Sequence, residues 1–220
     1  MMILDLPRSH IILIILWLAY FTIHSILASV SFKEFVACKL PGLIPAYRLI
    51  FNILASILLL PPLYLIARYP GEMVWQWSGG WQYLSYFFAA AAMAGFFWTL
   101  RYYDSSEFLG TRQIKDNRTE ILGQEQLQLS PMHRYVRHPW YALALVMLWT
   151  RDMHEALLIS AILITLYLFL GSYLEERKLI ASHGDQYSQY RQRVAGLIPL
   201  PWRVLSKHDA AELMRSREKK

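Results

Sequence analysis

Long apolar stretches separated by short polar segments dominate the chain, and this pattern predicts its fold. Four of the stretches are at least 18 residues long, enough as α-helices to cross the roughly 30 Å hydrocarbon core of a bilayer. A fifth stretch is shorter. The predicted transmembrane helices are 11–28, 47–67, 83–100, 140–150 and 156–174. We therefore expect an all-α integral membrane protein, a helical bundle with five transmembrane helices of which the last two form a hairpin.

The short fourth stretch, 140–150, has only 11 residues and would be about 16 Å long as a helix. It cannot cross a bilayer unaided. The polar segment before it ends in His138 and Pro139, and we expect that segment to lie below the headgroup level in a cavity lined by protein. The short helix thus predicts a buried polar site.

The segment after the last apolar stretch has the pattern of an amphipathic helix. Tyr187 and Tyr190 are three residues apart and Val194 follows four residues later, so their side chains share one helix face. We expect this helix to lie in the membrane interface.

Composition fits a membrane protein. Hydrophobic residues make up 55% of the chain and charged residues 17%, and the mean hydropathy is +0.26. Soluble domains carry about 25% charged residues. The 8 Trp and 14 Tyr fit the aromatic belts of membrane interfaces. Because Cys38 is the single cysteine, an internal disulfide and a CxxC metal or redox site are excluded.

The net charge of +6 follows the predicted topology. Of the 22 Lys and Arg residues, 19 fall on one side of the five helices and three, Arg8, Arg68 and Arg151, on the other. By the positive-inside rule, the N-terminus is expected outside and the C-terminus in the cytoplasm. Topology accounts for the basic residues, so we expect membrane lipids and no nucleic acid as partners.

Ionisable residues collect around the last two predicted helices. Arg137 and His138 precede the short helix, at a depth where ionisable groups are costly and usually functional. Glu175 and Glu176 end the last helix, where the negative end of the macrodipole disfavours carboxylates. A cation would offset this, either Arg137 in a plain salt bridge or a bound cationic ligand. The sequence contains no metal-ligand motif and no Gly-rich phosphate loop, so no metal is expected.

Four motifs resemble the C-terminal signature of the isoprenylcysteine carboxyl methyltransferase superfamily, which includes phospholipid methyltransferases. They are RHPWY at 137–141, EERKL at 175–179, HGDQYSQYRQRV at 183–194 and IP at 198–199. The N-terminal half resembles a narrower branch, that of bacterial methanethiol S-methyltransferases and nurim-like membrane proteins. The matching features are IHSILAS at 23–29, Lys33, YRLIFN at 47–52 and EFLGTRQI at 107–114.

The resemblance implies an enzyme of the bacterial inner membrane that uses S-adenosylmethionine to methylate a small lipophilic thiol, such as methanethiol, giving dimethyl sulfide. Two alternatives stay open. One is a carboxyl or phospholipid methyltransferase acting on a lipid or prenylcysteine, and the other is a non-catalytic nurim-like membrane protein. The expected organisation is one polytopic membrane domain over 1–220, with three transmembrane helices in 1–100, a cofactor-binding core in 101–205 and a basic tail in 206–220.

The resemblance also implies roles for particular residues. S-adenosylmethionine carries a sulfonium, an ammonium, a carboxylate and two ribose hydroxyls, so its site needs acids, a base and aromatic faces. The residues expected to bind it are Tyr135, Arg137, His138, Tyr141, Glu175, Glu176, Tyr187 and Tyr190. Catalytic roles are expected for Arg137 and Arg112, as cations that favour a thiolate, and for His138 as a base. His24 is expected either to line a substrate channel or to form a helix-packing hydrogen bond, and Gln113 is expected to line the channel.

Overall fold

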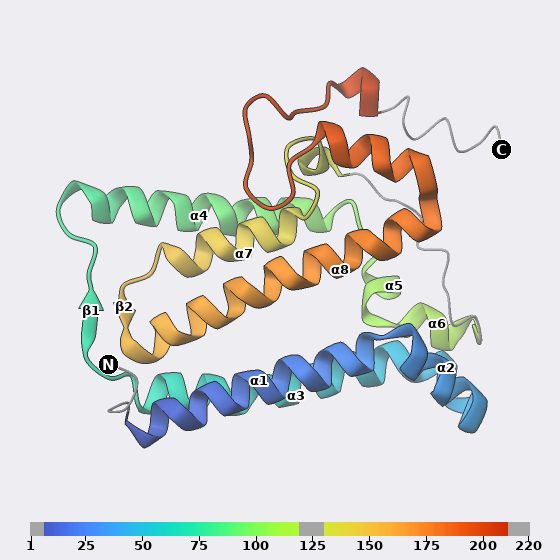
Figure 1. Ribbon diagram of the computed structural model, residues 1–220, viewed down its shortest axis with the longest axis horizontal. Coiled ribbons are helices and arrows are strands. Elements are labelled where there is room, and N and C mark those ends of the chain that lie inside the picture. Colours follow the sequence, from blue (N-terminus) through green and yellow to red (C-terminus); the bar gives the residue numbers. More distant parts are fainter. Residues whose placement is uncertain (1–6, 119–129, 211–220) are drawn as a thin grey trace. The chain divides into compact units, whose positions relative to one another are not determined.

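The computed structural model describes residues 7–118 and 130–210. The regular elements of these residues are helices, apart from one short pair of strands (Figure 1). The α-helices are α1 (Arg8–Ala28), α2 (Val30–Lys39), α3 (Tyr47–Arg68), α4 (Gly80–Leu100), α5 (Ser105–Leu109), α6 (Thr111–Lys115), α7 (Pro139–Trp149) and α8 (Glu155–Arg193). Two 3₁₀ helices, η1 (Pro41–Ala46) and η2 (Pro131–Arg134), and two antiparallel strands, β1 (Met73–Trp75) and β2 (Met153–His154), complete the elements. The predicted all-α class is confirmed.

All five predicted apolar segments are helices, namely α1, α3, α4, α7 and α8. Four helical segments of the described chain are long and apolar enough to cross a membrane: Arg8–Ala28, Pro41–Arg68, Gly80–Leu100 and Glu155–Arg193. Helix α7 has 11 residues, the length expected from the sequence. Many large apolar side chains of the long helices, such as Ile15, Leu60 and Leu166, point outward, as a lipid environment requires. The helices therefore fit a membrane helical bundle.

Helix α8 is longer than the apolar stretch that predicts it. It continues past residue 174 to Arg193, interrupted only at Gly184, whose φ of 54° and ψ of −128° kink the backbone. The prediction that Glu175 and Glu176 end the last helix is therefore wrong. The drop in hydropathy after residue 174 marks only the end of the apolar stretch. The helix continues because residues 175–183 contain no Gly or Pro that would interrupt its backbone hydrogen bonds. The bend is visible in the orange part of α8 (Figure 1).

The chain divides into two compact units, each built from separate parts of the sequence. The first comprises 1–76, 103–126 and 152–163, and the second comprises 77–102, 127–151 and 164–220. Residues 1–6, 119–129 and 211–220, which include the last ten residues of the predicted basic tail, lie outside the described residues.

In the first unit, α1 packs along α3, and the Tyr47 hydroxyl donates to the Leu27 carbonyl over 2.5 Å. The buried Trp17 indole donates to the Ser160 hydroxyl at the start of α8 over 2.8 Å. At this end of α8, Glu155 and Glu72 are joined by a backbone hydrogen bond of 3.0 Å beside the strand pair. Because hydrogen bonds are directional and apolar contacts are not, these polar contacts align the helices.

In the second unit, α4 packs along α7. Ala92 is buried, and Gly95 lets Leu143 approach so closely that a Cβ at residue 95 would lie 3.3 Å from the Leu143 Cδ2 atom. The Trp140 indole donates to the Thr99 hydroxyl over 2.9 Å, and Trp149 donates to Thr165 of α8 over the same distance. Small residues in α4 thus permit close helix contact, and two indoles fix the register.

The short helices α5 and α6 dock on the start of α3. The Asn52 side chain donates to the carbonyls of Phe108 and Leu109 over 3.1 and 3.2 Å. These hydrogen bonds satisfy carbonyls at the end of α5, where a helix supplies no partner of its own. Gly110 then reverses the chain with a φ of 93°. The YRLIFN and EFLGTRQI segments, 55 or more residues apart in sequence, are therefore in contact.

Gly110→Ala is expected to lower the free energy of unfolding by about 2 kcal/mol or more. A Cβ there would lie 2.6 Å from the Leu49 backbone nitrogen, and the positive φ disfavours any side chain. The matched control is Gly171→Ala in α8, where nothing lies within 4 Å of the added Cβ and helix propensity favours Ala. Thermal unfolding in detergent measures both variants. Equal melting temperatures for the two would contradict the tight turn.

Candidate active site

The second unit brings three distant segments together around the start of α7. His138 occupies the N-cap position of α7, and Pro139 is the first residue of the helix. At that first position the missing N–H of proline costs nothing, because an N–H there would have no partner within the helix. The Arg137 amide donates to the Ala195 carbonyl over 2.8 Å, and the His138 amide to the Gly196 carbonyl over 3.2 Å. The segment that follows α8 is therefore pinned to the segment that precedes α7, and both adjoin the middle of α8.

Arg137 is the central connector of this cluster. Its Nε and Nη2 atoms donate to Glu176 Oε1 over 2.8 and 2.6 Å. Its Nη1 atom donates to the carbonyls of Arg191, over 2.9 Å, and Val194. Both side chains of the ion pair are at least 91% buried, since 9% and 8% of them are exposed. Of the two cationic partners that the sequence leaves open for the acidic pair, the salt bridge with Arg137 is present.

Glu176 is shared among three cationic groups. Besides Arg137, His138 Nε2 lies 3.1 Å from Oε1, and Arg191 Nε lies 3.1 Å from Oε2. A carboxylate has about four acceptor sites, and these contacts occupy most of them. Glu176 therefore holds the cluster together and has little capacity left for a ligand.

Glu175 is placed differently. One residue along a helix rotates a side chain by about 100°, and the Glu175 side chain is 48% exposed. Its Oε2 atom lies 3.4 Å from His138 Nδ1, and its carboxylate also interacts with the Tyr141 hydroxyl. The Tyr141 ring stacks on the His138 ring, with centroids 5.5 Å apart and an interplanar angle of 9°. Glu175 is thus an accessible carboxylate beside an aromatic stack.

His138 lies between the two carboxylates, and this determines its charge. Burial lowers the pKa of His138, but hydrogen bonds to Glu175 and Glu176 and their negative charges outweigh burial and raise it overall. When His138 is protonated, three cationic side chains face two carboxylates: Arg137, His138 and Arg191 against Glu175 and Glu176. The cluster then carries a net positive charge.

Tyr187 and Tyr190 form the core beneath this cluster. Each is 1% exposed, and together with Val194 and Leu205 they form one buried group. The Tyr190 hydroxyl donates to the His133 carbonyl over 2.7 Å. The shared helix face expected from the sequence is therefore a buried face in the second unit. Tyr135, in contrast, is half exposed, with the Arg134 guanidinium 5.6 Å from its ring centroid.

The other predicted site residues belong to the first unit. Arg112 pairs with Asp104 over 2.6 Å and lies 3.7 Å from Asp116. Asp104 caps α5, and hydrogen bonds from Ser106 and Arg112 lower the pKa of Asp104 to about 2. The charge of Arg112 is thus compensated by two acids.

His24 and Gln113 also lie in this unit. The His24 ring lies 5.1 Å from the Phe51 ring, between α1 and α3. Gln113 Nε2 donates to the Glu107 carbonyl over 3.1 Å, while its Oε1 atom is buried without a partner in the described residues. The first unit therefore holds three of the predicted residues and the second unit the rest.

Sequence comparison identifies relatives over most of the chain. Methanethiol S-methyltransferase 2 of Bradyrhizobium diazoefficiens is 32% identical over 181 residues, covering 80% of this chain and 68% of the relative. Methanethiol S-methyltransferase of Mycobacterium tuberculosis is 31% identical over 195 residues, covering 82% and 74%. The chain belongs to the methanethiol S-methyltransferase family. This agrees with the resemblance of its N-terminal half and places it in the predicted branch of membrane methyltransferases.

Other alignments with members of the family are shorter. Methanethiol S-methyltransferase 1 of Bradyrhizobium diazoefficiens is 37% identical over 102 residues, and the chain spans about a third, 34%, of that relative's length. No protein-family model and no solved structure match the chain. Within the described residues, no group of three or more His, Cys, Asp or Glu side chains is arranged to hold a metal ion.

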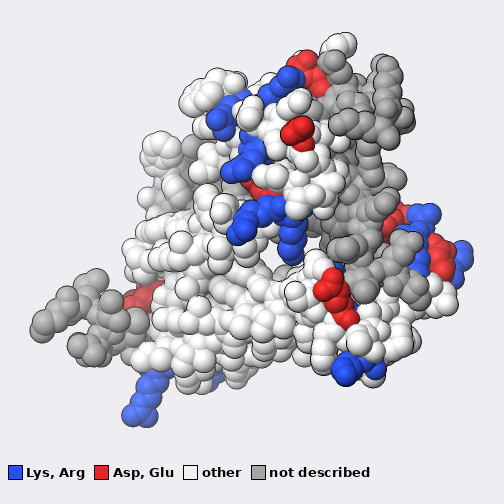
Figure 2. Space-filling model, turned by 45° about the vertical axis from the view of Figure 1, so that its right-hand side comes forward, with Lys and Arg blue, Asp and Glu red and all other residues white. Residues whose placement is uncertain are grey.

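Two members of the cluster were not among the predicted site residues. Arg191 lies four residues after Tyr187, so it reaches Glu176 from the next turn of the helix beyond the Gly184 kink. Its place in the HGDQYSQYRQRV motif and its spacing from Tyr187 are the signals that the sequence offers for it. Figure 2 shows Lys and Arg side chains close together on the upper part of this face.

His133 is the second such residue. Its Nδ1 atom accepts from the Ser130 amide over 3.0 Å and caps η2. Burial, together with the positive charge of His138, lowers the pKa of His133 to about 4. The Ser-Pro-Met-His spacing at 130–133 is the sequence signal for this cap.

His133→Asn is expected to reduce the loss of stability in mild acid. Above pH 6.5 His133 is neutral in both the folded and the unfolded protein. Below pH 6.5 the unfolded protein binds a proton at His133, whereas the folded protein binds it only near pH 4. Stability is therefore lost as the pH falls through this window, by about 3 kcal/mol. The raised pKa of His138 acts in the opposite sense and is present in both proteins. Melting temperatures between pH 7.5 and 4.5 measure the difference.

The control is His208→Asn at an exposed position. It should retain the acid sensitivity of the parent protein. An equal acid response of His133→Asn and the parent would refute the role of buried, neutral His133.

Proposed function

We propose that the protein is an S-adenosylmethionine-dependent membrane methyltransferase that methylates a small lipophilic thiol such as methanethiol, giving dimethyl sulfide. The observation that carries the proposal is family membership over 80% of the chain, since the relatives bear that activity in their names. The cluster around Arg137 supports it chemically. It combines an accessible carboxylate, cationic nitrogen donors and an aromatic stack.

These groups match the parts of the proposed cofactor. Glu175 would bind the ammonium, because its carboxylate is half exposed and retains free acceptor sites. Arg191, 46% exposed, would bind the carboxylate, since its terminal nitrogens have no partner in the described part of the chain. The His138 and Tyr141 stack and the exposed Tyr135 ring would face the adenine or the sulfonium. The donor set therefore fits S-adenosylmethionine.

The remaining predicted residues would position these groups. Glu176 and Arg137 would hold His138 and Arg191 in place, and Tyr187 and Tyr190 would anchor the segment after the Gly184 kink. When bound, the cofactor supplies a methyl group activated by a sulfonium. The chain's own part is to align the acceptor, exclude water and favour a thiolate.

Thiolate formation is the step for which the cluster's charge matters. A thiol with a pKa near 8.5 is only a few per cent ionised at neutral pH. The excess of cations at the cluster, with His138 protonated, would lower that pKa. Arg112, whose charge two acids compensate, would contribute less than Arg137, Arg191 and His138.

The test is incubation of the purified protein in detergent with methyl-labelled S-adenosylmethionine and a panel of thiols, phospholipids and prenylcysteines. We expect labelled methyl thioethers, formed faster as the pH rises toward 8.5 because the thiolate fraction rises. Labelled esters, formed at a rate that does not change above about pH 5, would instead identify a carboxyl methyltransferase. Labelled phospholipids would identify a phospholipid methyltransferase. Absence of cofactor binding in calorimetry would support a non-catalytic membrane protein.

We further propose that the chain crosses a bacterial inner membrane five times, with the N-terminus outside and the C-terminus in the cytoplasm. Helix α7, at 11 residues, would cross with the help of the polar segment before it, and the amphipathic segment around Tyr187 and Tyr190 would lie near the cytoplasmic surface. A green fluorescent protein fused after Lys220 should fluoresce. A fused alkaline phosphatase that is active instead would overturn this topology.

A further inference from the structure

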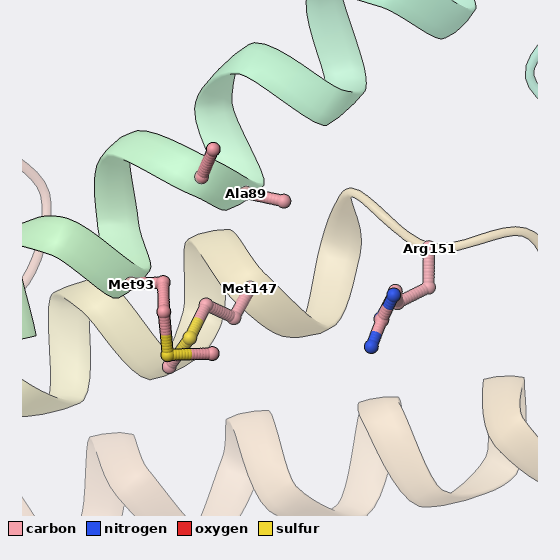
Figure 3. A pocket seen from close by; sticks show the side chains of 5 residues that line it. Ala89, Met93, Met147 and Arg151 are labelled. Carbon is pink, nitrogen blue, oxygen red and sulfur yellow. The ribbon is translucent and has the colours of Figure 1, made fainter.

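A groove between α4 and α7 lies apart from the cluster around Arg137. It is a cavity of about 240 Å³ in the second unit, lined by Ala89, Ala90 and Met93 of α4 and by Met147 and Arg151 at the end of α7 (Figure 3). Figure 3 shows the Met93 and Met147 side chains meeting at one end of it, with Arg151 at the other. Four of the five lining residues are apolar, and the fifth carries a full positive charge.

The groove lies well below the outer end of α4. The Trp140–Thr99 hydrogen bond aligns the beginning of α7 with the end of α4. Arg151 consequently lines the same cavity as Ala89 and Ala90, nine and ten residues after Gly80. That distance is about 14 Å along the helix.

Aromatic side chains mark the interface at the outer end of α4. Trp81 and Tyr83 are 66% and 75% exposed there, as in an interfacial belt. The Arg151 backbone lies near this end, because its carbonyl accepts from the indole of Trp77, which precedes α4, and the Arg151 side chain lines the groove beside Ala89 and Ala90. A guanidinium that enters an apolar groove is stabilised there by an anion.

The compensating anion does not come from a described side chain. No carboxylate of the described residues forms an ion pair with the Arg151 side chain. Its backbone amide donates to the Leu148 carbonyl over 3.4 Å, and its backbone carbonyl accepts from the Trp77 indole over 3.2 Å. The other lining residues offer no polar side-chain group. An occupant must therefore present an anion to Arg151 and apolar surface to the alanines and methionines.

We propose that this groove binds a membrane phospholipid, with its phosphate on Arg151 and one acyl chain along Ala89, Ala90, Met93 and Met147. The guanidinium pairs with phosphate through two parallel N–H donors, and its apolar stem lets it reach toward the headgroups. The small side chains of Ala89 and Ala90 leave the space that the acyl chain fills. The site is independent of the methyl-transfer chemistry.

Native mass spectrometry of the delipidated full chain tests the proposal with three probes. Dioleoylphosphatidylglycerol has phosphate and acyl chains, dioleoylglycerol has only the chains, and glycerol 3-phosphate has only the phosphate. We expect one phosphatidylglycerol to be retained, and each of the other probes to bind about tenfold more weakly or not at all. Equal retention of dioleoylglycerol would overturn the role of Arg151.

Matched variants locate the site. Arg151→Gln and Ala90→Phe should each reduce phosphatidylglycerol retention about tenfold, one by removing the charge and the other by filling the groove. Arg68→Gln changes another exposed arginine on the same predicted side of the membrane, and Ala91→Phe enlarges the exposed neighbour of Ala90. Both controls should retain lipid as the parent does.

The variants also guard against misfolding. Ala90→Phe and Ala91→Phe add the same surface to adjacent positions of α4, so a loss of lipid in the first alone cannot reflect instability shared by both. Retention unchanged in Arg151→Gln and Ala90→Phe, or lost equally in all four variants, would overturn the proposal.

Discussion

Glu175→Gln is expected to weaken binding of S-adenosylmethionine by about tenfold to 150-fold while the melting temperature stays near that of the parent. The change removes the charge of the accessible carboxylate, and a charge-assisted hydrogen bond to a ligand contributes about 1.5–3 kcal/mol. Stability should change little, because the Glu175 side chain is half exposed and its contact with His138 is 3.4 Å long. Isothermal titration calorimetry and thermal unfolding measure the two quantities.

Glu176→Gln is the matched comparison, with the same chemical change one residue along the helix. It leaves Arg137 buried without its counter-charge and weakens the hold on His138 and Arg191. We expect both the melting temperature and the cofactor affinity to fall. The nucleoside adenosine, which is the cofactor without its amino-acid end, should also bind more weakly. If Glu175→Gln bound the cofactor as the parent does while folded Glu176→Gln did not, the roles assigned to the two acids would be reversed.

The positions of the helices could be predicted from the sequence because lipid is a uniform solvent that selects long apolar runs. The end of α8 could not be predicted, since hydropathy does not report backbone hydrogen bonding. Glu175 and Glu176 therefore lie inside the helix and not at its predicted end. The same limit applies to α5 and α6, whose docking on α3 depends on two hydrogen bonds from Asn52. Local pattern gives no sign of such distant contacts.

The residues of the second-unit cluster were largely predictable as a set, but their arrangement was not. Arg137 and Glu176 are 39 residues apart, and Arg137 and Val194 are 57 apart. They meet only because Gly184 turns the end of α8 so that the carbonyls of Arg191 and Val194 face Arg137. From the sequence, Arg137 was equally suited to a ligand carboxylate or to a salt bridge. The geometry commits it to Glu176, and within the described residues it leaves the terminal nitrogens of Arg191 available as donors.

Arg137→Ala is expected to have the largest effect on stability, lowering the free energy of unfolding by about 3 kcal/mol. The substitution leaves buried Glu176 with His138 and Arg191 as its partners in the described residues. It also removes the two hydrogen bonds that Arg137 Nη1 donates to the segment after the kink. The segment should then open more often. Hydrogen exchange of the amides of 187–197, together with thermal unfolding in detergent, measures this effect, and exchange in α4 provides an internal reference.

Arg137→Lys separates the charge of this residue from its shape. A lysine ammonium can pair with Glu176, but it cannot also reach two backbone carbonyls in the fixed directions that a guanidinium provides. We therefore expect Arg137→Lys to recover part of the melting temperature lost in Arg137→Ala while exchange in 187–197 stays fast. Full recovery of both quantities would mean that charge alone holds the segment. An Arg137→Ala variant with parental exchange would mean that the backbone bridge between Val136 and Ala195 suffices, and that Arg137 is free to act on a ligand.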